Sequence, residues 1–309
     1  MTTSIVETAG GTAPRSPRRT AVRSVNRLFR RSRALAASCL VGPAVLWLLV
    51  VYVLSLVLLI FASLYTIDDF TFETTDVRTL DNLRRAFTQR DVLDVVLRSV
   101  LVALAVTAVC LVIALPTAFY IAKVAKPWAR RGLIVSCLLP LWAGYLVKGY
   151  AWKALLRPAG EGADGGFLQS VFGFTPGFGM VAVVMTLTYL WLPFMILPIY
   201  AGLERLPPSL LDAAGDLGAK PLRTFTSVII PLLVPAIAAG SIFTFSLSLG
   251  DFIMPRLASE GKVTMIGNLI YSTFLAPNQP LAAAYTLWPL LIIVVYLLGM
   301  RRAGAFESL

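Results

Sequence analysis

The stretch "LPPSLLDAAGDLGAKPLRTF" occupies residues 206–225, between two strongly apolar segments. It is too short and too polar to cross a bilayer, which takes about 20 consecutive apolar residues. The Pro-Pro pair suits the first turn of a helix, where a missing N–H costs nothing. The pattern predicts a surface helix of about ten residues, roughly 15 Å long. Gly218 can end it in a left-handed conformation, and Pro221 can open a second helix that runs into a span.

A helix of this length is marginally stable alone, so another surface must cover it. Asp212 and Asp216 lie one turn apart and could face basic or polar groups of a partner. Small residues make one side nearly featureless: Ala213, Ala214, Gly215 and Gly218. Two interpretations follow, a helix held by another protein or an ordinary amphipathic helix packed on its own chain.

The composition indicates an integral membrane protein. Of the 309 residues, 58% are hydrophobic and only 14% are charged, far less charge than a soluble domain of this size carries. Six segments are apolar enough to span a membrane, so we predict an all-α protein with six transmembrane helices. The expected spans are about 36–65, 96–124, 133–156, 179–203, 225–250 and 283–300, with a tail at 1–35, a loop at 204–224 and a short tail at 301–309.

The charged residues predict the orientation. Eight arginines lie between Arg15 and Arg33, and the second loop is also basic, with Lys123, Lys126, Arg130 and Arg131. Acidic residues gather in the first loop, and Glu161 and Asp164 follow the third segment. Because basic loops stay on the cytoplasmic side, we expect both termini and the 204–224 loop there. The arginine-rich tail is expected to contact anionic membrane lipids rather than nucleic acid.

Several kinds of chemistry have no support in the sequence. There is no histidine, which is the commonest general base and metal ligand. No phosphate-binding loop occurs, so the chain is not expected to bind ATP. Cys39, Cys110 and Cys137 fall in or beside apolar runs, as small buried hydrophobic residues do. We therefore predict no catalytic residue, no metal ligand and no cofactor in this chain.

The spacing of the quoted stretch resembles the EAA loop of ABC importer permeases. In that loop, EAA is followed by three residues, a glycine, nine residues and I-x-L-P. Here Asp212-Ala213-Ala214 precede Gly218 at the same distance, and Val228-Ile229-Ile230-Pro231 follow at the expected place. The departure that matters is Asp for Glu, because a shorter carboxylate changes the reach of a salt bridge. The resemblance implies a coupling helix, gripped by a cytoplasmic ATPase through Asp212, Ala213, Ala214, Asp216 and Gly218.

Further stretches are similar to the spermidine/putrescine branch of these permeases. They are "LPLWAGYLVKGYAWKALL" (139–156), where Lys148-Gly149 replaces a common Arg-Thr pair, and "SLGDFIMPRLASEGKVTMIGNLIYSTFL" (248–275). The resemblance covers most of residues 40–300. It implies the type I importer fold and the bacterial inner membrane. The implied partners are two ATPase subunits that bind ATP and Mg, a second homologous permease and an extracytoplasmic substrate-binding protein.

Charged residues within or beside spans are the first candidates for a substrate path. Asp251 ends the fifth segment, and a polyamine path needs carboxylates together with aromatic faces for cation–π contact. The candidates are Asp251, Phe252, Tyr189, Trp191, Trp142 and Tyr145. The alternative is that Asp251 caps a helix end and that the aromatic residues anchor the membrane interface. Lys148 and Lys153 argue against a strongly anionic pore, unless they reach the rim.

Three alternatives stay open from the sequence. The same machinery could import another small solute, such as an amino-phosphonate, an opine-like compound or a metal complex. An ion-coupled secondary transporter would be expected to carry more carboxylates inside its spans and to show an internal repeat. An intramembrane enzyme has the least support, because the spans contain neither histidine nor paired carboxylates.

Overall fold

The computed structural model describes residues 33–68, 74–159 and 165–302. Most of the predicted N-terminal tail, most of the C-terminal tail, and Glu161 and Asp164 lie outside the described residues. The chain divides into two units, Met1–Leu58 and Leu59–Leu309, which are described separately. The first unit contributes most of helix α2 (Arg33–Ala62), whose apolar part, Val41–Ala62, is long enough to cross a bilayer.

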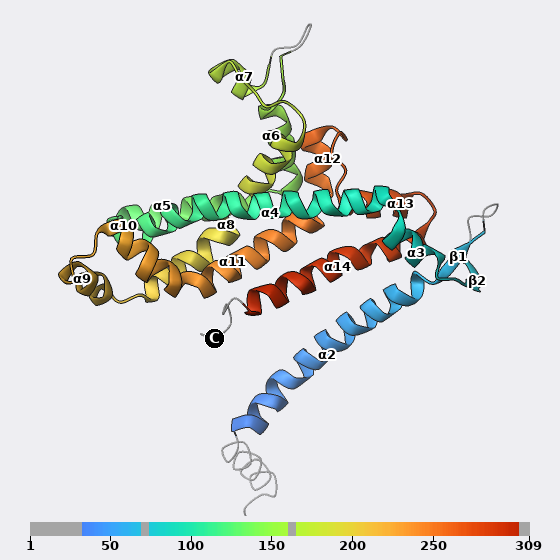
Figure 1. Ribbon diagram of the computed structural model, residues 1–309, viewed down its shortest axis with the longest axis horizontal. Coiled ribbons are helices and arrows are strands. Elements are labelled where there is room, and N and C mark those ends of the chain that lie inside the picture. The colour runs from blue at the N-terminus through green and yellow to red at the C-terminus, as the bar shows by residue number, and fades with distance from the viewer. Residues whose placement is uncertain (1–32, 69–73, 160–164, 303–309) are drawn as a thin grey trace, which may run out of the picture. The chain divides into compact units, whose positions relative to one another are not determined.

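Four long helices form the body of the second unit: α4 (Arg90–Phe119), α8 (Met180–Arg205), α11 (Ile230–Gly250) and α14 (Gln279–Arg302). Helices α4, α8 and α11 contact one another, and α14 lies against α11 (Figure 1). A Cβ atom on Gly240 of α11 would lie 2.8 Å from Sδ of Met195 on α8. This close approach therefore requires glycine, as is common where membrane helices meet.

The third predicted span is broken. Helix α5 (Pro127–Trp142) and helix α6 (Tyr145–Leu155) meet at an angle of 97°. Ala143 and Gly144 separate them in extended or turn conformations, close after Pro140 within α5. In the part of the chain that the structure describes, five single helices are long and apolar enough to span, and there are six when this bent pair is counted as one span. The predicted all-α membrane fold is confirmed, and its six spans correspond to this count.

Several short elements were not predicted. In the first loop, strands β1 (Tyr65–Ile67) and β2 (Thr74–Arg78) pair antiparallel. The remaining helices are α3 (Asp81–Thr88), α7 (Phe167–Phe172), α12 (Ile253–Ser259) and α13 (Ile266–Leu275). Two π-helical turns, η1 (Tyr120–Val124) and η2 (Phe225–Ile229), follow α4 and precede α11. Such turns are rare and frequently occur at functional sites.

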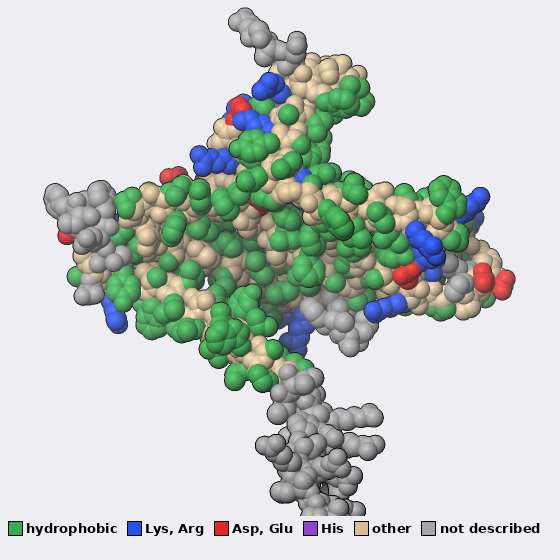
Figure 2. Space-filling model, turned by 180° about the vertical axis from the view of Figure 1, so that it is seen from behind, with side chains coloured by type: hydrophobic (Ala, Val, Ile, Leu, Met, Phe, Trp, Pro, Cys, Tyr) green, Lys and Arg blue, Asp and Glu red, His purple; other side chains and the backbone are tan. Residues whose placement is uncertain are grey.

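The two ends of the second unit differ in what they carry. Helices α9 (Pro208–Asp216) and α10 (Pro221–Thr224) lie at one end of the bundle, while α3, α13 and the β-hairpin lie at the other (Figure 1). Apolar side chains cover most of the face seen in Figure 2, and charged side chains gather at its ends and on the projecting part. This distribution suits a bundle that lies in hydrocarbon with its ends in water.

A serine of α4 holds the start of α13. The Ser99 hydroxyl accepts the backbone N–H of Ile266 at 2.7 Å and donates to the Val95 carbonyl at 2.7 Å. Ser99 and Ile266 are both fully buried. The first N–H groups of a helix have no partner within it, so this contact satisfies a donor that burial would otherwise leave unpaired.

We therefore expect Ser99→Ala to destabilise the protein by about 1–3 kcal/mol, the typical cost of a buried donor left without its acceptor. Thermal unfolding of the purified protein in detergent measures the change. Ser136→Ala is the matched control, because exposed Ser136 bonds only to the Gly132 carbonyl of its own helix. Equal melting temperatures for the two variants would contradict the assigned role of Ser99.

Candidate functional site

The predicted surface helix exists as α9, which runs from Pro208 to Asp216. Gly218 follows it with φ of 74°, a left-handed conformation that favours glycine. The N–H of Gly218 donates to the Gly215 carbonyl at 2.8 Å, and the N–H of Ala219 donates to the Ala214 carbonyl at 3.0 Å. The predicted glycine cap is thus confirmed, and it turns the chain sharply before α10.

The exposed side of α9 only partly matches the predicted one. Asp212, Ala213, Gly215 and Asp216 are exposed, and so is Gly218 beyond the helix. Ala214 is 9% exposed and faces its own chain. Leu217 contributes an apolar group that the prediction did not include, because its side chain is 88% exposed. The resulting surface has two carboxylates, small residues and one leucine, and it can receive another protein.

A cluster of polar contacts anchors the loop that carries α9. Arg130 of α5 forms an ion pair with Glu204 near the end of α8. The Arg130 Nε also donates to the Tyr200 hydroxyl at 2.9 Å, which donates to Glu204 at 2.6 Å. Lys123 donates to the Leu206 carbonyl at 2.8 Å. These contacts tie the start of the loop to the neighbouring helices, so a force on α9 passes into the bundle.

The other end of the loop is held by an aromatic contact. Phe225, the first residue of η2, meets Phe119 at the end of α4, edge to face at 5.6 Å between ring centroids.

The basic second loop was predicted only as a sign of orientation. The ion pair of Arg130 with Glu204 could have been suspected from the sequence, because Glu204 is an acidic residue at the end of a span.

A second cluster lies where two helical segments break. Tyr145 opens α6 directly after the bend, and its hydroxyl donates to Oδ2 of Asp251 at 2.5 Å. Oδ1 of the same carboxylate accepts the N–H groups of Ile253 and Met254, both at 3.1 Å. Asp251 is only 6% exposed. The carboxylate therefore caps the start of α12 and joins it to α6.

The structure brings together only part of the predicted substrate path. Trp191 of α8 stacks on Tyr145 with 6.2 Å between ring centroids, so Asp251, Tyr145 and Trp191 form one cluster. Tyr189 instead packs against Trp152, at 5.4 Å.

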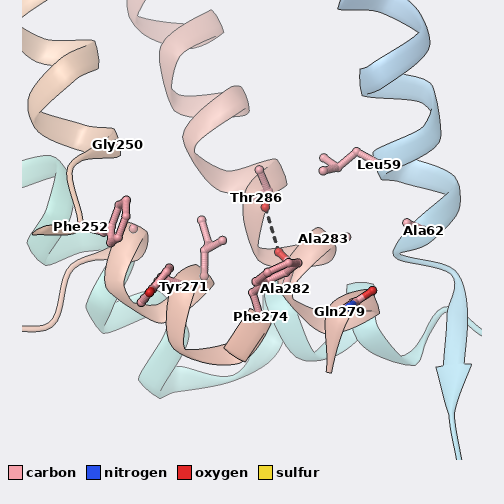
Figure 3. Close-up of a pocket in the computed structure, with 12 residues that line it drawn as sticks. Leu59, Ala62, Gly250, Phe252, Tyr271, Phe274, Gln279, Ala282, Ala283 and Thr286 are labelled. Atoms are coloured by element: carbon pink, nitrogen blue, oxygen red, sulfur yellow. Dashed lines mark hydrogen bonds between the residues drawn. The ribbon is translucent and has the colours of Figure 1, made fainter. Parts of the chain in front are cut away.

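Two more of the predicted residues lie outside this cluster. Trp142 is 91% exposed at the end of α5. Phe252 stacks on Tyr271 at 4.6 Å in a separate apolar pocket, which Figure 3 shows. Of the five aromatic candidates, only Tyr145 and Trp191 thus lie in the cluster with the Asp251 carboxylate.

Comparison with known proteins gives the family. Residues 40–303 match the family described as "Binding-protein-dependent transport system inner membrane component". The chain belongs to this family. This ABC permease is accordingly a multi-pass protein of the inner membrane, and its family is one of transport permeases rather than enzymes.

Individual relatives agree with this assignment. The chain is 41% identical to the inner membrane ABC transporter permease protein YdcU of Escherichia coli (strain K12) over 310 residues, which cover 95% of this chain and 98% of YdcU. It is 34% identical to the spermidine/putrescine transport system permease protein PotB of the same strain, over 84% of this chain and 94% of PotB.

A solved structure supports the fold. The crystal structure of a bacterial ABC transporter involved in the import of alginate matches 90% of this permease and 99% of the compared chain, with a TM-score of 0.62. At 16% identity, this likeness concerns the fold alone. The arrangement of helices is therefore that of an ABC importer permease.

The bond between Tyr145 and Asp251 can be measured. Tyr145→Phe and Asp251→Asn are each expected to lower stability, and the double variant to lose less than the sum, with a coupling of about 1–3 kcal/mol for a bond to a charged group. Thermal unfolding of the purified permease measures all three. Tyr150→Phe on the same helix serves as the control, since Tyr150 is 60% exposed. Additive single effects would contradict a direct bond.

Proposed function

We propose that this permease imports polyamines such as spermidine and putrescine, and that α9 couples it to a separate ATPase that hydrolyses ATP. The carrying observation is α9 itself, an exposed helix with an EAA-like spacing that ends in a left-handed glycine. Polar contacts before α9 and an aromatic contact after it hold this helix against the bundle, so movement of α9 would be transmitted to the bundle. Alternating access would then follow from movement of α9 when the ATPase subunits close.

The proposed assembly has one copy of this chain beside a second, homologous permease. Two cytoplasmic ATPase subunits hold ATP and Mg, and one of them grips α9. A substrate-binding protein delivers cargo from the outside, as the family description implies. In this proposal both termini and α9 face the cytoplasm, because the loops nearest α9 carry Lys123, Lys126, Arg130 and Arg131.

A polyamine cargo is supported by two separate lines. PotB, which carries spermidine/putrescine in its name, is similar along most of the chain. The buried carboxylate of Asp251 beside Tyr145 and Trp191 offers what an ammonium group prefers, a negative charge and aromatic faces.

Lys153 of α6 does not contradict this cargo. The Lys153 ammonium pairs with Glu260 at 3.0 Å and lies over the ring of Phe178, 5.8 Å from its centroid. Its charge is thereby compensated locally. Import of another small solute by the same machinery is the competing proposal, and it differs only in the cargo that the binding protein delivers.

Gly218→Trp tests whether α9 is the coupling helix. Gly218 and Gly177 both have positive φ, 74° and 65°, and a Cβ atom at either would meet nothing within 4 Å. The two variants therefore carry similar backbone strain, but only Gly218 lies next to α9. We expect spermidine-stimulated ATP hydrolysis by the reconstituted transporter to fall at least tenfold in Gly218→Trp, while Gly177→Trp stays within about twofold of wild type.

The same assay separates the two parts of the proposal. Full stimulation in Gly218→Trp would mean that α9 is not the coupling helix. Stimulation of the wild type by a different solute, and not by spermidine or putrescine, would overturn the polyamine cargo while leaving α9 in its role.

Asp251→Asn tests the cargo at its proposed contact. The amide keeps the size of the side chain but removes its charge, so we expect the apparent affinity for spermidine in uptake assays to fall by about tenfold, the equivalent of ~1.4 kcal/mol. Asp91→Asn, which removes an exposed carboxylate in the first turn of α4, is the matched control in uptake. Unchanged uptake by Asp251→Asn would restrict Asp251 to capping α12.

A further inference from the structure

The aromatic cluster beside Asp251 continues along the bundle as a row of rings. Trp191 stands 5.9 Å from Phe194, and Phe194 stands 6.4 Å from Phe243, measured between ring centroids. With Tyr145, which lies 6.2 Å from Trp191, four rings follow one another at nearly equal spacing. They come from three segments, α6, α8 and α11, so the row exists only in the folded protein.

We infer that this row, Tyr145–Trp191–Phe194–Phe243 with Asp251 at its head, is the track along which successive ammonium groups of a linear polycation pass this permease. The inference rests on the proposed polyamine cargo and goes beyond it by assigning the path. Phe194 and Phe243 are new to that path, whereas Tyr189, Trp142 and Phe252 are excluded from it by their positions.

Trp191 brings a polar group into the row. Its indole Nε1 is buried and meets no acceptor among the residues that the structure describes. The hydroxyl oxygens of Thr186, Thr188 and Ser248 share this property. Helices α8 and α11 thus carry buried polar groups among their apolar side chains.

Breaks in the helices lie at the head of the row. Tyr145 follows the 97° bend between α5 and α6, and Asp251 follows the end of α11. Irregular backbone at membrane depth is tolerated where it is buried or lines a water-filled cavity, and broken helices mark substrate sites in many transporters. The breaks therefore place a buried carboxylate beside the first ring of the row.

The far end of the row is open. Phe243 lies about two turns before the end of α11 at Gly250. Its side chain is 55% exposed, whereas Trp191 and Phe194 are half-buried. The row thus leads from a buried carboxylate to an open ring.

The spacing suits the cargo. The three centroid separations resemble the distance between amines joined by an extended propyl or butyl linker, so neighbouring ammonium groups can occupy neighbouring rings. Each exposed cation–π contact is weak, about 0.5–1 kcal/mol, and the energy varies little from ring to ring. A series of shallow, similar sites lets a cation advance without being trapped, as conduction through multi-site pores requires.

Ring fluorination tests the inference without changing size or fold. Fluorine withdraws electrons from the face of the ring and weakens cation–π attraction stepwise. Phenylalanine with one, two or three ring fluorines is introduced at Phe194 or Phe243, and radiolabelled spermidine uptake is measured in proteoliposomes with the complete transporter. The control is the same series at Phe87, whose ring packs on Trp288, 4.7 Å away, away from the row.

We expect uptake to fall progressively with each fluorine at Phe194 and Phe243, by about 3- to 30-fold over the series, and to stay constant at Phe87. A flat response at both row positions, with the wild type importing spermidine, would overturn the track and leave the proposed cargo standing. A wild-type transporter that imports neither spermidine nor putrescine would overturn the proposed cargo and the track with it.

Discussion

A bilayer leaves no backbone polar group without a partner, and this constraint explains the position of Asp251. Where α11 ends and α12 begins, the first two N–H groups of α12 have no partner within their helix, and such groups cost several kcal/mol each if they are left unpaired in hydrocarbon. One carboxylate oxygen of Asp251 accepts both of them, and the other oxygen accepts the Tyr145 hydroxyl from the broken third span. A single buried side chain therefore holds two breaks together, and the aromatic row is built upon that junction.

The contacts near α9 differ in kind from those deeper in the bundle. Where α8 leads into α9, the contacts are an ion pair and hydrogen bonds, which water can replace when they move. Arg130 pairs with Glu204, and Lys123 holds the Leu206 carbonyl. Farther along α8 and α11, the contacts are apolar and close, as at Gly240 against Met195. Movement of α9 is thus expected to displace these helices as bodies, with the π-helical turns η1 and η2 next to the loop absorbing the change.

Sequence reasoning worked where the cues were local. Proline before α9, the left-handed glycine after it and the spacing between them are short-range signals, and the helix appeared at the predicted place. The weak third span also carried a local cue, because Pro140 and Gly144 surround the bend. Tyr145 and Asp251, in contrast, are 106 positions apart, and only the packing of α6 against α12 brings them together. Phe194 and Phe243 were missed because an aromatic residue inside a long apolar run has no pattern that separates path from core.

The capping of α12 by Asp251 and its proposed contact with the cargo are energetically linked. A cation that approaches this carboxylate competes with Tyr145 and with the N–H groups of α12 for the same oxygens. Whatever free energy the cation gains there is partly offset by weakening the junction between α6 and α12. Binding of cargo and the shape of this junction are therefore linked, and by reciprocity a movement that loosens the junction raises the affinity of Asp251 for a cation. The placement of Asp251 at the joint of two movable segments is what makes it suited to report the presence of cargo to the rest of the bundle.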